Sequence, residues 1–164
     1  MTLGTILTVW TIRAAAVLYA LSVTSWLRRC DSSARLTWSI ACLFYLVHVG
    51  CAFNFYHHWS HSAAYEDTSR RTAELLGASW GGGLYFNYLF TLVWIVDVIW
   101  WWRGLAWYRR RPRWIQASVH AFFAFMFFNA TVVFAEGPVR WLGLVATAIL
   151  GLVWWRSDRG VRAI

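Results

Sequence analysis

Long apolar runs alternate along the chain with short polar or charged segments. Five of these runs span approximately residues 3–27, 36–56, 84–102, 114–135 and 139–155. A helix needs about 20 mostly apolar residues to cross the hydrocarbon core of a bilayer, and each run approaches or exceeds that length. The pattern therefore predicts an all-α integral membrane protein with five transmembrane helices, built as a single domain over residues 1–164.

The last two runs are joined by the sequence EGPVR. Proline is favoured in the first turn of a helix, so Pro138 predicts the start of a new one. A single very long helix over 114–155 is the alternative, and the Gly137–Pro138 pair disfavours it.

The longest connection lies between the second and third runs and contains the sequence SAAYEDTSRRTAELLG. Its helix-forming residues, with Gly77 suited to end a helix, predict an amphipathic helix lying on the membrane surface.

The composition supports a membrane protein. The chain is 60% hydrophobic, 20% aromatic and 13% charged, whereas soluble domains have about 25% charged residues. A net charge of +8 would suggest nucleic acid as a partner of a soluble protein. Here the arginines cluster between the apolar runs, so we expect the lipid bilayer and no nucleic acid as the partner.

The charges of the connections alternate and thereby predict an orientation. The first connection, the third connection and the C-terminal tail are rich in arginine, whereas the second and fourth mix acids with arginines. Basic connections remain in the cytoplasm. We therefore expect the N-terminus outside, the C-terminus in the cytoplasm, and a multi-pass location in the inner or plasma membrane.

The stretch FNFYHHWSH at residues 53–61 contains a candidate metal site. If the second helix continues past Tyr56, His58 and His61 share one face and His57 points almost the opposite way. Imidazoles at this spacing suit Zn²⁺ or Cu, with a third ligand from an acid on the same side. The alternative is that these histidines are solvated at the interface.

His48 lies deeper, inside the second run, where an ionisable residue suggests a functional site such as a cofactor ligand. Haem bound between His48 and His120 is one hypothesis. At 1.5 Å per residue, however, His48 lies about 18 Å and His120 about 9 Å from the inner boundary. Axial ligands must face each other across one iron, so this difference in depth disfavours the pair.

Asp97 and His120 lie at similar depths in the third and fourth runs. An Asp–His pair would offset the cost of an isolated charge in hydrocarbon, either to hold two helices together or to transfer protons. Arg13, near the middle of the first run, also needs a partner or water, and the sequence identifies no acid for it.

Gly143, Thr147 and Gly151 recur every four residues in the fifth run. Small residues at this spacing permit close helix packing. We expect this face to contact another span, another membrane subunit or a second copy of the chain.

Three functions fit these features. The chain contains no P-loop, dinucleotide fingerprint, Ser–His–Asp pattern or CxxCH haem attachment, which favours a non-catalytic subunit or accessory protein of a larger membrane assembly. The first alternative is a redox protein that binds Cu, Zn or haem through His58 and His61 with His48 nearby. The second is a small proton-coupled transporter or channel, which would use Arg13, His48, Asp97 and His120.

Overall fold

The computed structural model describes residues 2–28 and 30–162, with side chains up to residue 152. These residues form helices and connections, without a strand. The elements are α1 (Leu3–Leu27), α2 (Asp31–Phe55), α3 (His61–Leu76), α4 (Gly83–Arg103), α5 (Leu105–Arg109), α6 (Arg113–Phe128), the π-helix η1 (Asn129–Val133) and α7 (Pro138–Arg162).

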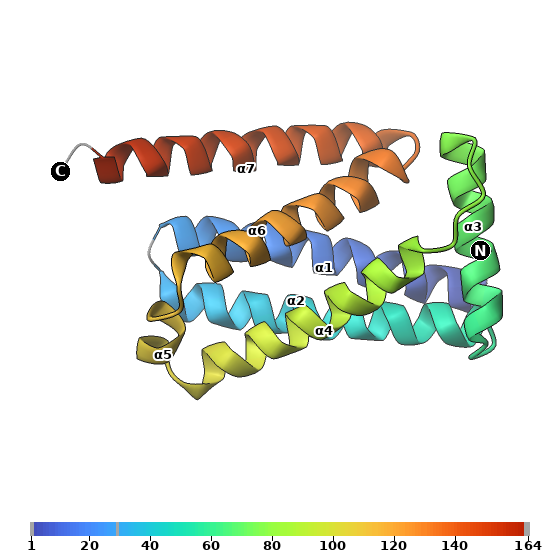
Figure 1. Cartoon of the computed structure of the whole chain (residues 1–164), viewed down its shortest axis with the longest axis horizontal. Coiled ribbons are helices and arrows are strands. Elements are labelled where there is room, and N and C mark those ends of the chain that lie inside the picture. Colours follow the sequence, from blue (N-terminus) through green and yellow to red (C-terminus); the bar gives the residue numbers. More distant parts are fainter. Residues whose placement is uncertain (1, 29, 163–164) are drawn as a thin grey trace.

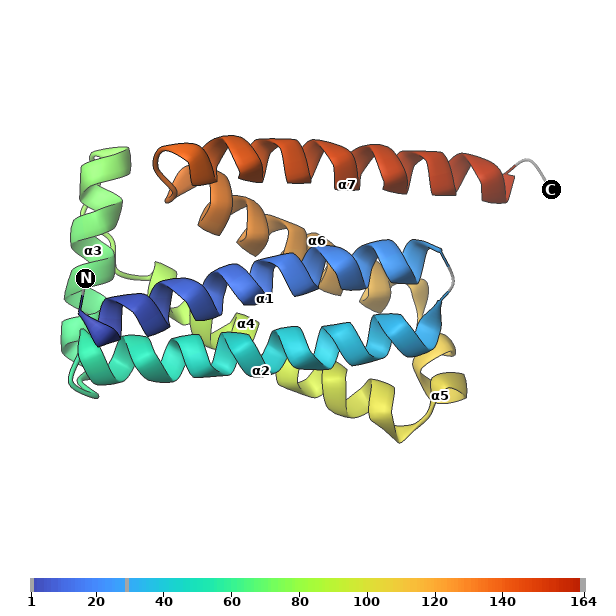
Figure 2. The same ribbon diagram turned by 180° about the vertical axis from the view of Figure 1, so that it is seen from behind.

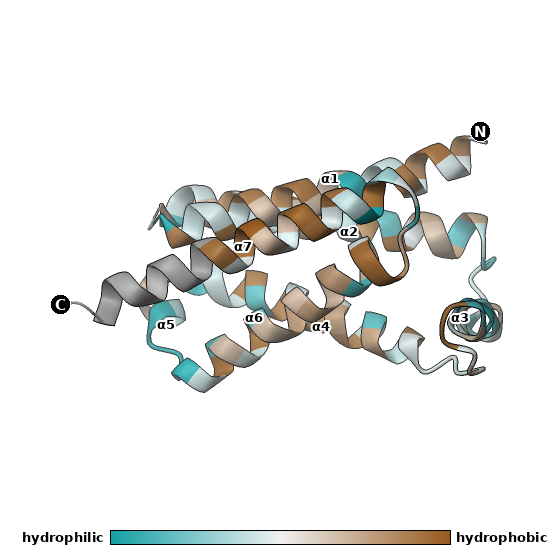
Figure 3. Ribbon diagram, turned by 90° about the horizontal axis from the view of Figure 1, so that it is seen from above, coloured by the Kyte–Doolittle hydropathy of each residue, from teal (hydrophilic) through white to brown (hydrophobic). Residues whose placement is uncertain are grey.

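The long helices run roughly along one axis (Figures 1 and 2). Helices α1 and α2 lie side by side, α4 and α6 cross them at a slant, and α7 runs along the outside. The short α5 lies at one end of the bundle, and α3 lies across the other, nearly perpendicular to the long helices. We refer to these as the α5 end and the α3 end. Viewed from above, α4 and α6 lie in a second layer beneath α1, α2 and α7 (Figure 3).

Among the residues that the structure describes, four helical segments are long and apolar enough to cross a membrane: α1, α2, α4 and the continuous stretch Arg113–Val133 formed by α6 and η1. The apolar part of α7, Pro138–Leu152, is shorter. Many large apolar side chains on these helices face outward, including Val17, Leu21, Leu92 and Leu142. An apolar outer surface of this extent is typical of a protein surrounded by lipid.

Helices α1 and α2 pack closely because small side chains line their contact. The buried residues of α1 include Gly4, Thr8, Thr11, Ala15 and Ser22, and those of α2 include Ala34, Ala41 and Cys42. The Ser22 hydroxyl donates to the Ala34 carbonyl at 2.8 Å and so joins the two helices. Small residues of this kind allow backbones to approach within a membrane.

An aromatic core joins this hairpin to α4 and α6. Phe123 of α6 is fully buried, with its ring centroid 4.8 Å from that of Trp38, 4.6 Å from Phe90 and 5.2 Å from Trp94. Trp38 also lies 5.3 Å from Trp94. Aromatic pairs at these separations contribute about 0.5–1.5 kcal/mol each beyond the area that they bury.

The predicted extension of the second helix through His58 is wrong. Helix α2 ends at Phe55, and His58 and Trp59 have positive φ angles of 47° and 58°. The Ser60 side chain then caps α3 by accepting from the Ala63 amide at 3.3 Å. A side-chain cap of this kind starts a new helix, so the chain turns between His57 and Ser60.

Helix α3 covers residues 61–76 and is followed by Gly77. Gly77 has a φ angle of 72°, a left-handed conformation that glycine adopts without steric cost.

The small residues Gly143, Thr147 and Gly151 of α7 differ in their surroundings, and Gly143 packs against another part of the same chain. A Cβ atom added at Gly143 would lie 2.4 Å from the Thr131 carbonyl oxygen, so this glycine permits α7 to pack against η1. Thr147 is partly buried, whereas a Cβ atom at Gly151 would meet open space.

Candidate functional site

A cavity of about 570 Å³ lies among α1, α2, α4 and α6 and reaches α3. We call it the main cavity. Its volume is within the range of about 300–1,000 Å³ in which small-molecule pockets fall. Its lining combines an apolar, largely aromatic wall with a smaller number of polar residues, as is usual for such pockets.

Aromatic rings form the wall of the main cavity on the side of the buried core. Tyr19, Phe90, Trp94, Phe123 and Phe127 all line it. Tyr19 and Phe127 lie nearly parallel, with ring centroids 5.1 Å apart. The wall therefore offers ring faces and edges rather than hydrogen bonds.

His48 lines the main cavity from α2 and is held in a defined orientation. Its Nδ1 atom lies 2.8 Å from the Thr8 carbonyl oxygen of α1. Since a carbonyl only accepts hydrogen bonds, Nδ1 is the donor. In the neutral ring, Nε2 then has a lone pair and no proton, and it acts as an acceptor.

The hydroxyl groups near His48 form a short chain that ends on the backbone. The Tyr45 hydroxyl lies 3.1 Å from Thr91 Oγ1, and Thr91 Oγ1 donates to the Asn87 carbonyl at 2.8 Å. Because the Thr91 proton is used in that bond, the Tyr45 proton lies between Thr91 Oγ1 and the Asn87 carbonyl, to which the Tyr45 hydroxyl donates at 3.4 Å. Both hydroxyl protons are therefore occupied, and the oxygen lone pairs remain available in the cavity.

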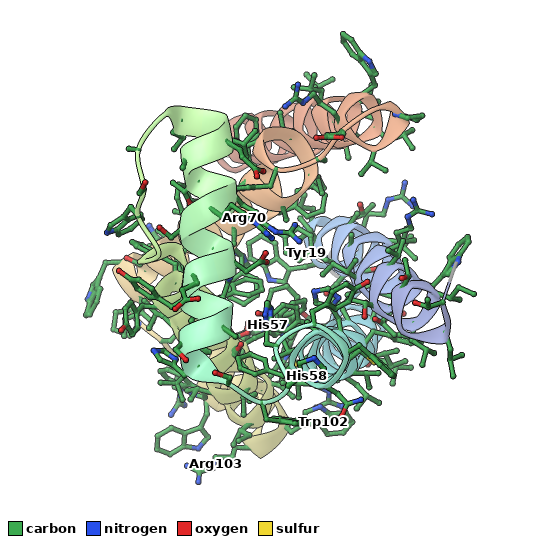
Figure 4. All side chains as sticks on the ribbon, turned by 90° about the vertical axis from the view of Figure 1, so that its right-hand side faces the viewer. Tyr19, His57, His58, Arg70, Trp102 and Arg103 are labelled. Carbon is green, nitrogen blue, oxygen red and sulfur yellow. The ribbon has the colours of Figure 1, made fainter. Side chains whose placement is uncertain are left out.

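The α3 end of the main cavity is polar. Asp67, Thr68 and Arg71 of α3 line it together with His57. Arg71 Nε donates to Asp67 Oδ2 at 3.0 Å, although the Arg71 side chain is 62% exposed. Figure 4 looks onto α3 and shows His57 in the space between α3 and the long helices.

The three histidines of residues 57–61 lie in different surroundings. His57 lines the cavity, whereas His58 is exposed and His61 Nδ1 lies 3.0 Å from the Tyr88 hydroxyl. The shared face predicted for His58 and His61 does not form, because α2 ends before His58 and α3 begins at His61. Within residues 2–28 and 30–152, no three His, Cys, Asp or Glu side chains gather as a metal site would require.

Arg13 also lines the main cavity, from α1. Its guanidinium carbon lies 5.2 Å from the ring centroid of Trp10. Contacts between a cation and a ring face are attractive at this distance. No salt bridge to Arg13 occurs in the described part of the chain.

A second polar cluster lies at the α5 end and consists of Asp97, Tyr108 and Arg111. Arg111 Nη1 donates to Asp97 Oδ1 at 2.5 Å, Tyr108 donates to Asp97 Oδ2 at 3.0 Å, and Arg111 Nη2 donates to the Tyr108 oxygen at 2.8 Å. The side chains of Arg111 and Asp97 are only 1% and 3% exposed. Burial, and then the Asp97 carboxylate, raise the pKa of the Tyr108 hydroxyl.

These bonds differ from the predicted pairing of Asp97 with His120. Both Asp97 oxygens are bonded to Tyr108 and Arg111, and no hydrogen bond joins Asp97 to His120 in the described structure. His120 Nε2 is buried without a protein partner, and the ring lies 4.8 Å from that of Trp26. Asp97 pairs with Arg111 rather than with His120 because the chain after α5 folds back and places the charged Arg111 side chain inside the bundle.

His120 belongs to a different space from His48. It lines a small cavity of about 10 Å³ together with Ser22, Trp38 and Tyr108, whereas His48 lines the main cavity. Trp38, on the wall of the small cavity, packs against Phe123 and Trp94 on the wall of the main cavity. The two histidines consequently do not face a common centre, which agrees with the argument from depth against a haem held between them.

Comparisons with known proteins add no family to these observations. No family model matches the chain, and neither the curated proteins nor the solved structures contain a match.

Proposed function

We propose that this chain is a non-catalytic, multi-pass membrane protein that binds an amphipathic small molecule in the main cavity. The observation that supports the proposal is the two-part lining of that cavity. Aromatic and aliphatic side chains form most of the wall, and polar groups gather toward α3. A ligand with an apolar body and one polar end would match both parts.

In the proposed topology, α7 is a fifth span, the N-terminus is outside and α3 lies on the outer surface. Arg103, Arg109, Arg110 and Arg113 surround α5, which favours a cytoplasmic location for the α5 end. Arg111 contributes less to this argument, because it is neutralised by Asp97. The side chains of the arginines in the C-terminal tail lie outside the described residues. This orientation places the polar part of the main cavity at the outer surface.

Ligand binding fits the arrangement better than proton-coupled transport. A transport path would need polar groups in sequence from one end of the bundle to the other. Rings of Trp38, Trp94 and Phe123 instead pack between the main cavity and the Asp97–Tyr108–Arg111 cluster. The role of accessory subunit stays a prediction. A partner helix could cover the apolar surface of α7, but the acyl chains of the bilayer would cover it equally well.

The test is to identify small molecules that remain with the protein after purification from its own membranes. Mass spectrometry of the solvent extract should find one amphiphile in a stoichiometric amount. Ala52 lines the main cavity, so Ala52→Phe should remove it. Ala124 is exposed on α6, and Ala124→Phe should retain it. Equal amounts in both variants, or only bulk lipid in the natural protein, would contradict the proposal.

A further inference from the structure

The main cavity offers hydrogen-bond acceptors beside a wall of aromatic rings, and this combination limits the chemistry of its ligand. Resting on the proposed function, we infer that the polar end of the ligand is an aromatic hydroxyl. Its O–H would donate to His48 Nε2. The ligand is accordingly a phenol or hydroquinone with an apolar tail.

The groups around His48 offer hydrogen-bond acceptors to a ligand. The Thr8 carbonyl holds the His48 proton on Nδ1, so Nε2 of the neutral ring can only accept. Thr91 donates to the Asn87 carbonyl, and the Tyr45 hydroxyl has Thr91 and the same carbonyl as acceptors, so neither hydroxyl has a proton left for a ligand. Arg13, elsewhere on the lining of the main cavity, could match the acceptors of an ester or an ether. Such a ligand would still leave His48 Nε2 without a donor.

The wall beside these acceptors consists of aromatic rings. The Tyr45 and His48 ring centroids are 6.4 Å apart, and Tyr45 in turn lies 5.0 Å from Phe90 and 5.3 Å from Trp94. The hydrogen-bond acceptors thus lie directly beside the aromatic wall. A planar ring can lie against such a wall in stacked or edge-to-face contacts, which a flexible aliphatic alcohol cannot make.

The surroundings of His48 suit a ligand hydroxyl better than a metal ion. An imidazole whose other nitrogen donates to a backbone carbonyl, as His48 does, is also the usual geometry of a metal ligand. A metal ion needs several ligands at one centre, and no three His, Cys, Asp or Glu side chains gather within residues 2–28 and 30–152. One acceptor is sufficient for one hydroxyl proton.

The experiment compares two probes that differ in a single proton donor, a long-chain 4-alkylphenol and its methyl ether. Both are titrated into the full chain in lipid nanodiscs, and binding is followed by calorimetry. An acceptor left without its donor lowers affinity, so the phenol should bind about tenfold more tightly than the ether. His48→Leu should abolish this preference. His48→Gln should restore part of it, because the amide can donate to Thr8 and accept from the phenol.

The outcomes distinguish the inference from the proposed function on which it rests. If neither probe binds the natural protein while one amphiphile still co-purifies with it in a stoichiometric amount, the assignment of the hydroxyl is overturned and the proposed function stands. If both bind with the same affinity, and Ala52→Phe blocks both, the cavity binds amphiphiles but the assignment of the hydroxyl is overturned. A preference for the phenol that persists in His48→Leu would also overturn the assignment, because another group would then accept the proton.

Discussion

Replacing Arg111 with leucine tests whether the buried cluster at the α5 end stabilises the fold. The substitution leaves the Asp97 carboxylate buried, with the Tyr108 hydroxyl as its remaining hydrogen-bond donor. Removing one partner of a buried ion pair costs about 3–5 kcal/mol, because the other charge remains uncompensated. We expect Arg111→Leu to lower the free energy of unfolding by this amount, measured by denaturant titration in mixed micelles with circular dichroism as the signal.

Arg109 provides a matched control in the same run of arginines. Its side chain is 61% exposed and pairs with Asp31, so Arg109→Leu should cost no more than about 1 kcal/mol. Replacing both Asp97 and Arg111 by leucine leaves mainly the Tyr108 hydroxyl unpaired, at about 1–3 kcal/mol. A loss below 1 kcal/mol for Arg111→Leu would refute the reasoning, as would a double variant that loses the sum of the two single losses.

Three further predictions follow from the packing and the proposed topology. A reporter fused after Ser69 should report the outer side and one in the α4–α6 connection the cytoplasm; a cytoplasmic signal from the Ser69 fusion would reverse the orientation. Gly143→Leu should lower the unfolding free energy by about 1–3 kcal/mol, because its Cβ would meet the Thr131 backbone, whereas Gly151→Ala should cost nothing; equal melting temperatures would contradict this. Ser22→Ala removes the hydrogen bond from α1 to α2 and should cost about 1 kcal/mol in the same assay; an unchanged value would show that the bond contributes nothing.

The spans were the part of the fold most open to prediction. The segments expected at 3–27, 36–56, 84–102 and 114–135 correspond closely to α1, α2, α4 and the pair of α6 and η1. Hydropathy identifies such segments because the backbone of a lipid-exposed segment must satisfy its own hydrogen bonds, so a long apolar run has to be helical. The buried face of the first helix could also have been predicted from the sequence. Its small residues recur at intervals of three, four or seven: Gly4, Thr8, Thr11, Ala15 and Ser22.

The partner of Asp97 could not be found by the same reasoning. Depth along an ideal helix placed Asp97 near His120, and the arginines after α4 were all assigned to the aqueous side. Only the path of the chain through α5 shows that Arg111 turns inward while Arg109 remains exposed. A buried acid next to a connection that contains five arginines was nevertheless a signal that one of them would pair with it.

His58 and His61 were placed on one face by counting 100° per residue, but the segment between them contains a turn. Ser60 followed by a helix-forming run is a start signal, and it should have ended the second helix before His58. With the turn in place, His57 lines the main cavity instead.

The apolar wall of the main cavity explains why a directional group such as His48 matters. The cavity is partly open rather than enclosed, so acyl chains of the bilayer can enter its apolar part. Acyl chains can fill an apolar volume as well as the body of any amphiphile, and the apolar wall therefore does not select between them. Selection has to come from groups that an acyl chain cannot satisfy, and the available lone pairs of His48 and Tyr45 are such groups. A ligand that donates to them displaces lipid because its polar end makes hydrogen bonds that an acyl chain cannot make. A ligand that only fills the space binds no more tightly than the acyl chains of the bilayer.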